Sequence, residues 1–229
     1  MSAEDPRAGA RRLFGAASLI AGGNVASRLL GLVREQVIAG YFATTLEASA
    51  LRAALRVPTM IYDLLIGGML SAALVPVLSS YASTRRAELW RALSVLLSTV
   101  TALTGLVALG LYGFAGPIAR ILAGGFPAEG VAIVAQSLRW LSPAVVMFGV
   151  AGTITGALYA LERFSRPAAA GALYNLALIA TLVLFRDRLG LYALPLGVTV
   201  GAVAQVLLLA PGLSGARLGV VFDLRHPAV

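Results

Sequence analysis

The fold is decided by residues 27–76, SRLLGLVREQVIAGYFATTLEASALRAALRVPTMIYDLLIGGMLSAALVP, an apolar stretch that nevertheless carries Arg28, Arg34, Glu35, Arg52, Arg56 and Asp63. A charged side chain at the centre of a bilayer costs roughly 2.5–3.5 kcal/mol on insertion scales. Charged residues in membrane helices therefore usually face the interior of a bundle or a water-filled cavity. The stretch predicts a membrane protein with a polar interior.

The composition of the whole chain supports this class. Of its 229 residues, 59% are hydrophobic and 12% are charged, whereas a soluble domain has about 45–50% apolar and about 25% charged residues. The net charge is +8, but the arginines lie in short clusters between apolar runs, which favours membrane topology over nucleic-acid binding. Cysteine is absent and His226 is the single histidine. We therefore expect no metal, no cofactor, no catalytic residue and no enzyme activity.

The apolar pattern predicts an all-α, polytopic bundle of six transmembrane helices, at about residues 14–40, 47–83, 92–119, 131–161, 167–185 and 190–213. Each is long enough, or nearly so, for the roughly 20 residues that span a bilayer. Pro58 and Pro143 are expected to kink the second and fourth helices. The charged run Arg186-Asp187-Arg188 is expected to form a tight loop between the last two.

The arginines also predict an orientation. Cytoplasmic segments of membrane proteins carry an excess of basic residues. With both termini in the cytoplasm, ten arginines lie on that side and five on the other. The cytoplasmic set is Arg7, Arg11, Arg12, Arg85, Arg86, Arg91, Arg163, Arg166, Arg217 and Arg225, against Arg34, Arg120, Arg139, Arg186 and Arg188. The first helix is expected to be retained rather than cleaved as a signal peptide.

The charges of the first two expected helices recur at helical spacing. Arg52 and Arg56 are four residues apart, and Asp63 follows seven residues after Arg56. Arg28 and Glu35 are likewise seven apart, so each set lies on one face. We expect a mostly cationic cavity between the two helices. Since guanidinium groups bind phosphate and carboxylate in a bidentate manner, such a cavity suits an anionic substrate.

A second arrangement of these charges stays open at this point. Arg34 and Glu35 could lie at the membrane interface while Arg52 and Asp63 pair inside the bundle. Small residues elsewhere predict close helix packing, with Gly149, Gly152 and Gly156 on one face and Gly197 and Gly201 on another.

Three segments of the chain resemble the MurJ/MviN family of lipid II flippases, within the exporter superfamily of multidrug, oligosaccharidyl-lipid and polysaccharide transporters. They are SRLLGLVREQVIAGYF, ALRVPTMIYDLLIGGMLSAALVPVLSSY and ALYALERFSRPAAAGALYNLALI, and the resemblance covers residues 13–215. It implies a transporter that flips a lipid-linked peptidoglycan precursor from the cytoplasmic to the outer leaflet of the bacterial plasma membrane by alternating access. It also implies two six-helix lobes around a cationic cavity.

The resemblance assigns roles to single residues. Arg28, Arg34 and Glu35 match cavity-lining positions, and Arg56 and Pro58 match a basic-x-Pro motif. A structural motif between the fourth and fifth helices is matched by Arg163, Phe164, Pro167 and Asn175. Arg52 and Asp63 rest on helical geometry alone. The chain departs from the family at Ser49, Tyr62, Asp63, Gly67 and Gly68, which puts the exact substrate in doubt.

The resemblance also implies a domain organisation, because family members are roughly twice as long. We expect a cytoplasmic tail at residues 1–12, one six-helix lobe at 13–215 and the start of a linker to a second lobe at 216–229. One lobe is not expected to transport alone; pairing as a homodimer is the alternative.

The expected partners of the chain are the lipid-linked anionic precursor, membrane lipids and the second lobe, with no nucleic acid. Two other functions stay open. One is an exporter of another polysaccharide-lipid or of a small cationic drug. The other is a non-transporting membrane scaffold for cell-wall enzymes.

Overall fold

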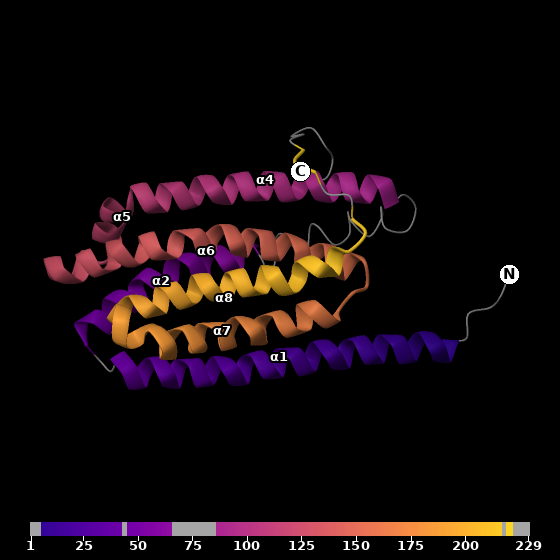
Figure 1. Cartoon of the computed structure of the whole chain (residues 1–229), viewed down its shortest axis with the longest axis horizontal. Coiled ribbons are helices and arrows are strands. Elements are labelled where there is room, and N and C mark those ends of the chain that lie inside the picture. Colours follow the sequence, from indigo (N-terminus) through magenta and orange to yellow (C-terminus); the bar gives the residue numbers. More distant parts are fainter. Residues whose placement is uncertain (1–5, 43–44, 66–85, 217–218, 222–229) are drawn as a thin grey trace.

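The computed structural model describes residues 6–42, 45–65, 86–216 and 219–221, which form long helices running along a common direction (Figure 1). No strand occurs in these ranges. The helices are α1 Pro6–Phe42, α2 Leu46–Leu65, α4 Arg86–Gly113, α5 Ala115–Leu122, α6 Ala128–Ala160, α7 Ser165–Leu189 and α8 Ala193–Leu209, with 3-10 turns η1 Gly190–Tyr192 and η2 Ala210–Leu213.

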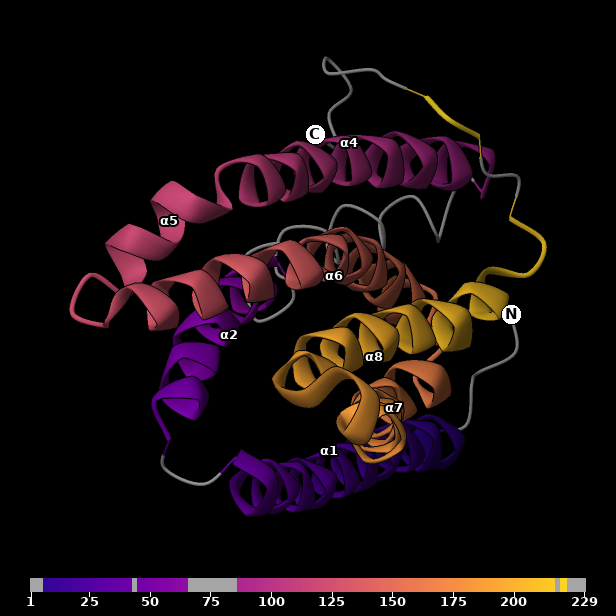
Figure 2. The ribbon, with the colours of Figure 1, turned by 60° about the vertical axis from the view of Figure 1, so that its left-hand side comes forward.

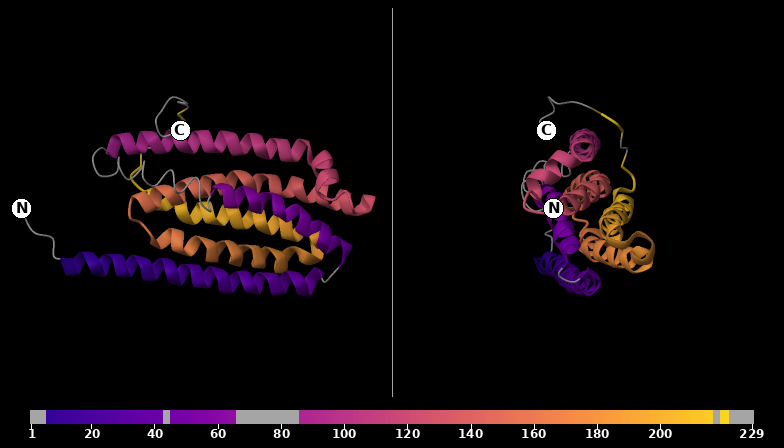
Figure 3. Two further views of the ribbon diagram at one scale, coloured as in Figure 1. Left: turned by 180° about the vertical axis from the view of Figure 1, so that it is seen from behind. Right: turned by 90° about the vertical axis from the view of Figure 1, so that its left-hand side faces the viewer.

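Helix α6 lies at the centre of the bundle and packs against α2, α4, α5 and α8 (Figures 2 and 3). Helix α7 packs against α8, and α1 lies along the outer side of α7. The buried core joins α6 to α7 and α8 through large side chains that include Leu138, Leu141, Phe148, Leu178 and Leu194. Helices α1 and α2 follow each other in the chain but pack on different partners, which leaves room for a cavity between them.

Three helical stretches in the described part of the chain are long and apolar enough to cross a membrane. They are Glu88–Gly113, Ala128–Ala160 and Ser165–Leu213. The third holds two antiparallel helices, α7 and α8, because the chain reverses at η1 (Figure 1). Helices α1 and α2 fall outside this set, and both carry several charged residues. The fold is therefore an all-α membrane bundle in which the described parts of α1 and α2 are too rich in charge to count as apolar spans.

Two helix ends differ from the sequence-based expectation. Helix α1 begins at Pro6 rather than near residue 14; proline suits the first turn, where its missing N–H has no helical partner in any case. The prediction of a loop at Arg186-Asp187-Arg188 is wrong, because these residues lie in the last turn of α7. The helix instead ends at Leu189 and is followed by Gly190, which has φ 56°. Basic side chains in the last turn interact favourably with the negative end of the helix dipole.

The expected third helix, 92–119, is also wrong as one element. It begins at Arg86 and breaks at Phe114 into α4 and α5. Pro117 explains the position of the break, since a proline has no N–H for the carbonyl four residues earlier, which is that of Gly113. The ladder resumes with the bond from Ile118 N to Phe114 O at 3.0 Å. The expected extension of the second helix to residue 83, including Gly67 and Gly68, lies outside the described residues.

The predicted close packing at small residues is confirmed at Gly149, Gly197 and Gly201. A Cβ added at Gly201 would lie 2.9 Å from the Tyr174 carbonyl oxygen, and one at Gly197 would lie 3.1 Å from that of Leu178. These glycines let α8 approach the backbone of α7. On α6, a Cβ at Gly149 would meet the Thr104 methyl group of α4 at 2.7 Å.

The turn between α6 and α7 is tied to the end of α8 by two arginines. Arg163 Nη1 donates to the carbonyl of Gly212, and Arg166 Nη1 donates to that of Leu208 at 3.0 Å. Both acceptors lie at the carboxyl end of α8 or in η2, where carbonyls lack helical partners. The contacts hold the ends of three helices together.

We expect Arg163→Met to lower the stability of the chain by about 1.5–3 kcal/mol, because a charged hydrogen bond is lost and the Gly212 carbonyl is left without it. The midpoint of thermal unfolding in detergent checks this. Arg188→Met is the matched control, since Arg188 is exposed near the end of α7, and it should unfold near the wild-type temperature. Equal midpoints for the two variants would contradict the role given to Arg163.

Candidate functional site

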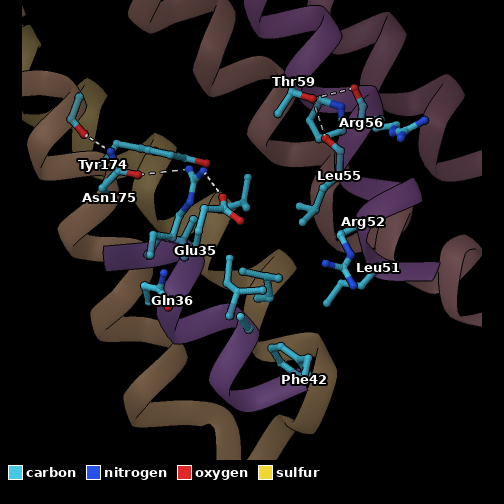
Figure 4. Close-up of a pocket in the computed structure, with 18 of the residues that line it drawn as sticks. Glu35, Gln36, Phe42, Leu51, Arg52, Leu55, Arg56, Thr59, Tyr174 and Asn175 are labelled. Carbon is cyan, nitrogen blue, oxygen red and sulfur yellow. Dashed lines mark hydrogen bonds and ion pairs between the residues drawn. The ribbon is translucent and has the colours of Figure 1, made fainter. Parts of the chain in front are cut away.

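A cavity of about 680 Å³ opens between α1 and α2 and reaches α6, α7 and α8 (Figure 4). This volume lies within the range of roughly 300–1,000 Å³ typical of ligand sites. Its charged lining residues are Arg34 and Glu35 of α1 and Arg52, Arg56 and Asp63 of α2. Five of the six residues predicted to bind substrate thus meet at one cavity.

Arg34 is held in a fixed position between α1 and α7. Its Nη1 donates to Asn175 Oδ1 at 3.2 Å, and its Nη2 forms an ion pair with Glu35 Oε1 at 2.6 Å. Asn175 is itself anchored, because its Nδ2 donates to the carbonyls of Ser27 at 3.1 Å and Gly171 at 3.0 Å. The Arg34 Nε is buried without a partner among the described residues. Arg34 therefore retains a buried donor that no described residue uses.

The α2 side of the cavity is more open. Arg52, Arg56 and Asp63 are all exposed. In Figure 4 the Arg52 side chain extends into the space between the helices, whereas the Arg56 guanidinium extends away from Glu35. Pro58 is buried inside α2, and the Thr59 hydroxyl donates to the carbonyls of Leu55 and Arg56, both at 2.9 Å. The backbone around the proline thus keeps local partners.

The described residues that line the cavity carry an excess of one positive charge, because they include three arginines and two carboxylates. The surface is therefore mixed rather than mostly cationic. Apolar side chains complete the wall: Ile38, Phe42, Leu51, Leu55, Phe148, Leu178, Leu194 and Val198. The rings of Phe148 and Tyr174 lie 5.9 Å apart on this wall. A cavity with charged and apolar walls suits an amphipathic, anionic ligand.

The remaining predicted residues lie elsewhere. Arg28 is exposed on α1, on the same face as Glu35 and about 10 Å from it along the helix, and does not line the cavity. Arg163, Phe164 and Pro167 lie at the α6–α7 turn, also outside the lining. The described residues contain no cluster of three or more histidines, cysteines or acids that could hold a metal.

Asn175 is the residue whose role sequence reasoning missed. The resemblance assigns it to a structural motif, but it lines the cavity and orients Arg34. Gln205 of α8 also lines the cavity and was not singled out. Both residues could have been found as amide side chains within apolar helices, since polar groups in membrane helices usually face the bundle interior.

Comparisons with known proteins agree on one family. The family model described as Lipid II flippase MurJ matches residues 38–227. The lipid II flippase MurJ of Burkholderia cenocepacia is 32% identical, over 95% of this chain and 44% of that protein. The chain thus spans less than half the length of this curated relative.

Two solved structures share the fold. A lipid II flippase MurJ in an inward closed conformation has a TM-score of 0.66 at 21% identity, covering 82% of this chain and 40% of that one. A MOP superfamily transporter from Pyrococcus furiosus, for which a reversed polarity of the binding pocket suggests a different function, has a TM-score of 0.62 at 18% identity. That match covers 97% of this chain and 48% of the other.

Proposed function

The chain belongs to the MurJ family of lipid II flippases, and from this premise we propose that it forms one lobe of a transporter that moves a lipid-linked peptidoglycan precursor across the bacterial plasma membrane. The observation that carries the proposal is the cavity between α1 and α2, which combines oriented guanidinium groups with an apolar wall. An undecaprenyl-pyrophosphate-linked sugar has the matching chemistry, with two phosphates beside a long apolar tail.

In this proposal the pyrophosphate binds at Arg34 and Arg52, with Arg56 and Arg28 at the rim. The ligand binds in competition with Glu35, whose carboxylate already forms an ion pair with the Arg34 guanidinium. The Arg34 Nε is buried and has no partner among the described residues, so it donates to a phosphate oxygen only when the Arg34 side chain turns towards the ligand. The carboxylate of Asp63 repels anions, so it limits the negative charge of a ligand that binds on the α2 side of the cavity. In this proposal the chain works as a transporter and not as an enzyme.

We further propose the arrangement of this lobe in the membrane. Both termini lie in the cytoplasm, residues 13–215 form the lobe, and residues 216–229 begin the linker to a second lobe. The coverage of less than half of the Burkholderia relative supports a second lobe in the same protein. Alternating access then rocks one lobe against the other and moves the precursor from the inner to the outer leaflet. A homodimer of this chain is the alternative source of the second lobe.

The proposal is tested by replacing the matching part of the Burkholderia cenocepacia flippase with this chain. We expect the chimera to restore growth to a bacterium depleted of its own flippase, and to bring lipid II to the outer leaflet. The 229-residue chain expressed alone is expected to restore neither, because half of the cavity is missing. A chimera that inserts at wild-type levels but fails to restore growth would contradict the proposal.

A further inference from the structure

Gln205 of α8 carries an unused acceptor at the cavity. The residue is 4% exposed and lines the cavity, on the side formed by α7 and α8. Its Nε2 donates to the carbonyl of Ala170 at 3.3 Å, which fixes the orientation of the amide. Its Oε1 is buried and has no partner among the described residues. Buried polar atoms are nearly always paired, so an unpaired carbonyl oxygen in a membrane bundle requires an explanation.

The surroundings of Gln205 favour a functional explanation over a structural one. Within Ala193–Leu209 it is the single amide side chain, and an apolar side chain of similar length would avoid the unpaired oxygen at this position. The one bond that it makes, to a carbonyl already within helix α7, is long. A residue that leaves a polar atom unpaired where two helices meet, and that also borders a cavity, is typical of a ligand-binding position.

The position of Gln205 relates it to the charged residues. Gly171 and Ala170 lie about 6 Å and about 7.5 Å from Asn175 along α7. Asn175 holds Arg34, and Gly171 packs against the Ser27 hydroxyl group of α1. The cavity wall therefore includes a neutral polar residue, Gln205, which contacts the turn of α7 that precedes Asn175. Two buried and unsatisfied atoms of opposite kind, a donor of Arg34 and an acceptor of Gln205, belong to residues that line the same cavity.

We propose that Gln205 Oε1 accepts a hydrogen bond from an uncharged O–H or N–H donor of the ligand, namely a hydroxyl or amide N–H of the saccharide attached to the pyrophosphate. The inference rests on the proposed function and adds the residue that distinguishes the sugar-bearing lipid from its sugar-free carrier. A metal ion is a poor occupant, because a single free oxygen is too few ligands. The nearby Arg34 also repels cations.

The test compares the binding of lipid II and of undecaprenyl pyrophosphate to the Burkholderia chimera that carries this chain, in nanodiscs. The two probes share the tail and the phosphates but differ in the saccharide. Gln205→Met keeps the length of the side chain and removes the acceptor. We expect it to weaken lipid II binding about three- to tenfold, as for one lost hydrogen bond, and to leave the binding of undecaprenyl pyrophosphate unchanged.

Thr199→Val is the matched control, because Thr199 lies on the same helix, donates to the Trp140 carbonyl and does not line the cavity. It should leave the ratio of the two affinities as in the wild type. Thermal unfolding in detergent separates a structural role: Gln205→Met should unfold at or above the wild-type temperature, since it removes an unsatisfied acceptor. A lower unfolding temperature together with equal losses for both probes would overturn the inference.

The outcomes also separate the inference from the proposed function. If the chimera with the wild-type chain binds neither probe, the proposed function fails and the inference fails with it. If that chimera binds both probes and Gln205→Met keeps the wild-type ratio, the acceptor holds water only, and the inference alone is overturned.

Discussion

Replacing Arg34 with alanine is expected to weaken lipid II binding by about two orders of magnitude and to abolish growth restoration by the chimera. In the proposed complex the Arg34 guanidinium donates charge-assisted hydrogen bonds to the pyrophosphate, and losing one such bond costs roughly 1.5–3 kcal/mol. Here the loss is aggravated, because Glu35 then keeps its charge at the cavity without its ion-pair partner and repels the phosphates. The measurements are the affinity of the purified chain for lipid II and the growth of the depleted strain.

Two further variants make the Arg34 result specific. Arg34→Lys keeps the charge but loses the planar fork that contacts Asn175 and Glu35 together, so we expect an intermediate affinity. Arg188→Met removes an exposed arginine outside the cavity and should bind and restore growth as the wild type does.

The Arg34→Ala variant also distinguishes the proposed function from its two alternatives. An exporter of small cations should improve or stay unchanged when Arg34 is lost. A scaffold for cell-wall enzymes should be insensitive to substitutions in the cavity and sensitive to substitutions in the loops. Full growth restoration by a chimera with Arg34→Ala would therefore rule out the flippase mechanism proposed here.

The membrane class, the helices and the cluster of charges could be predicted because they depend on local sequence. The composition excludes a soluble domain, and the spacing of Arg52 and Arg56 places them on one face of α2 whatever the rest of the chain does. The family resemblance, confirmed by the match over residues 38–227, adds the fold. The helix ends were less predictable. A charged run such as Arg186-Asp187-Arg188 suggests a loop, yet the helix continues to Leu189.

The role of Asn175 could not be predicted because it depends on residues far apart in the chain. Its partner Arg34 is 141 positions away, and the contact exists only because α1 lies along α7. The same holds for Gln205, whose unpaired oxygen becomes visible only when α8 is packed against Ala170. Sequence reasoning locates charges on a helix, but it does not show which of them another helix has already engaged.

Gly23→Ala is expected to destabilise the chain by at least about 2 kcal/mol and to impair growth restoration by the chimera. A Cβ at this position would lie 2.2 Å from the carbonyl oxygen of Ala168, which is backbone and cannot rotate away. Helix α1 must then move off α7. That shift also breaks the bonds from Asn175 to the Ser27 carbonyl and from Arg34 to Asn175, which cross the same interface. The measurement is thermal unfolding in detergent, followed by lipid II binding.

The neighbouring glycine provides a control that differs only in its contacts. A Cβ at Gly22 meets no atom within 4 Å, so Gly22→Ala adds the same methyl group to the same helix without a clash. Alanine favours a helix over glycine by about 1 kcal/mol, so Gly22→Ala should be neutral or stabilising. Gly23→Ala gains the same propensity and should still lose stability. Opposite signs at two adjacent positions can come only from the packing of α1 on α7, because helix propensity and composition are equal in both variants. If both substitutions stabilise the chain, α1 does not approach α7 this closely, and the orientation of Arg34 by Asn175 fails with it.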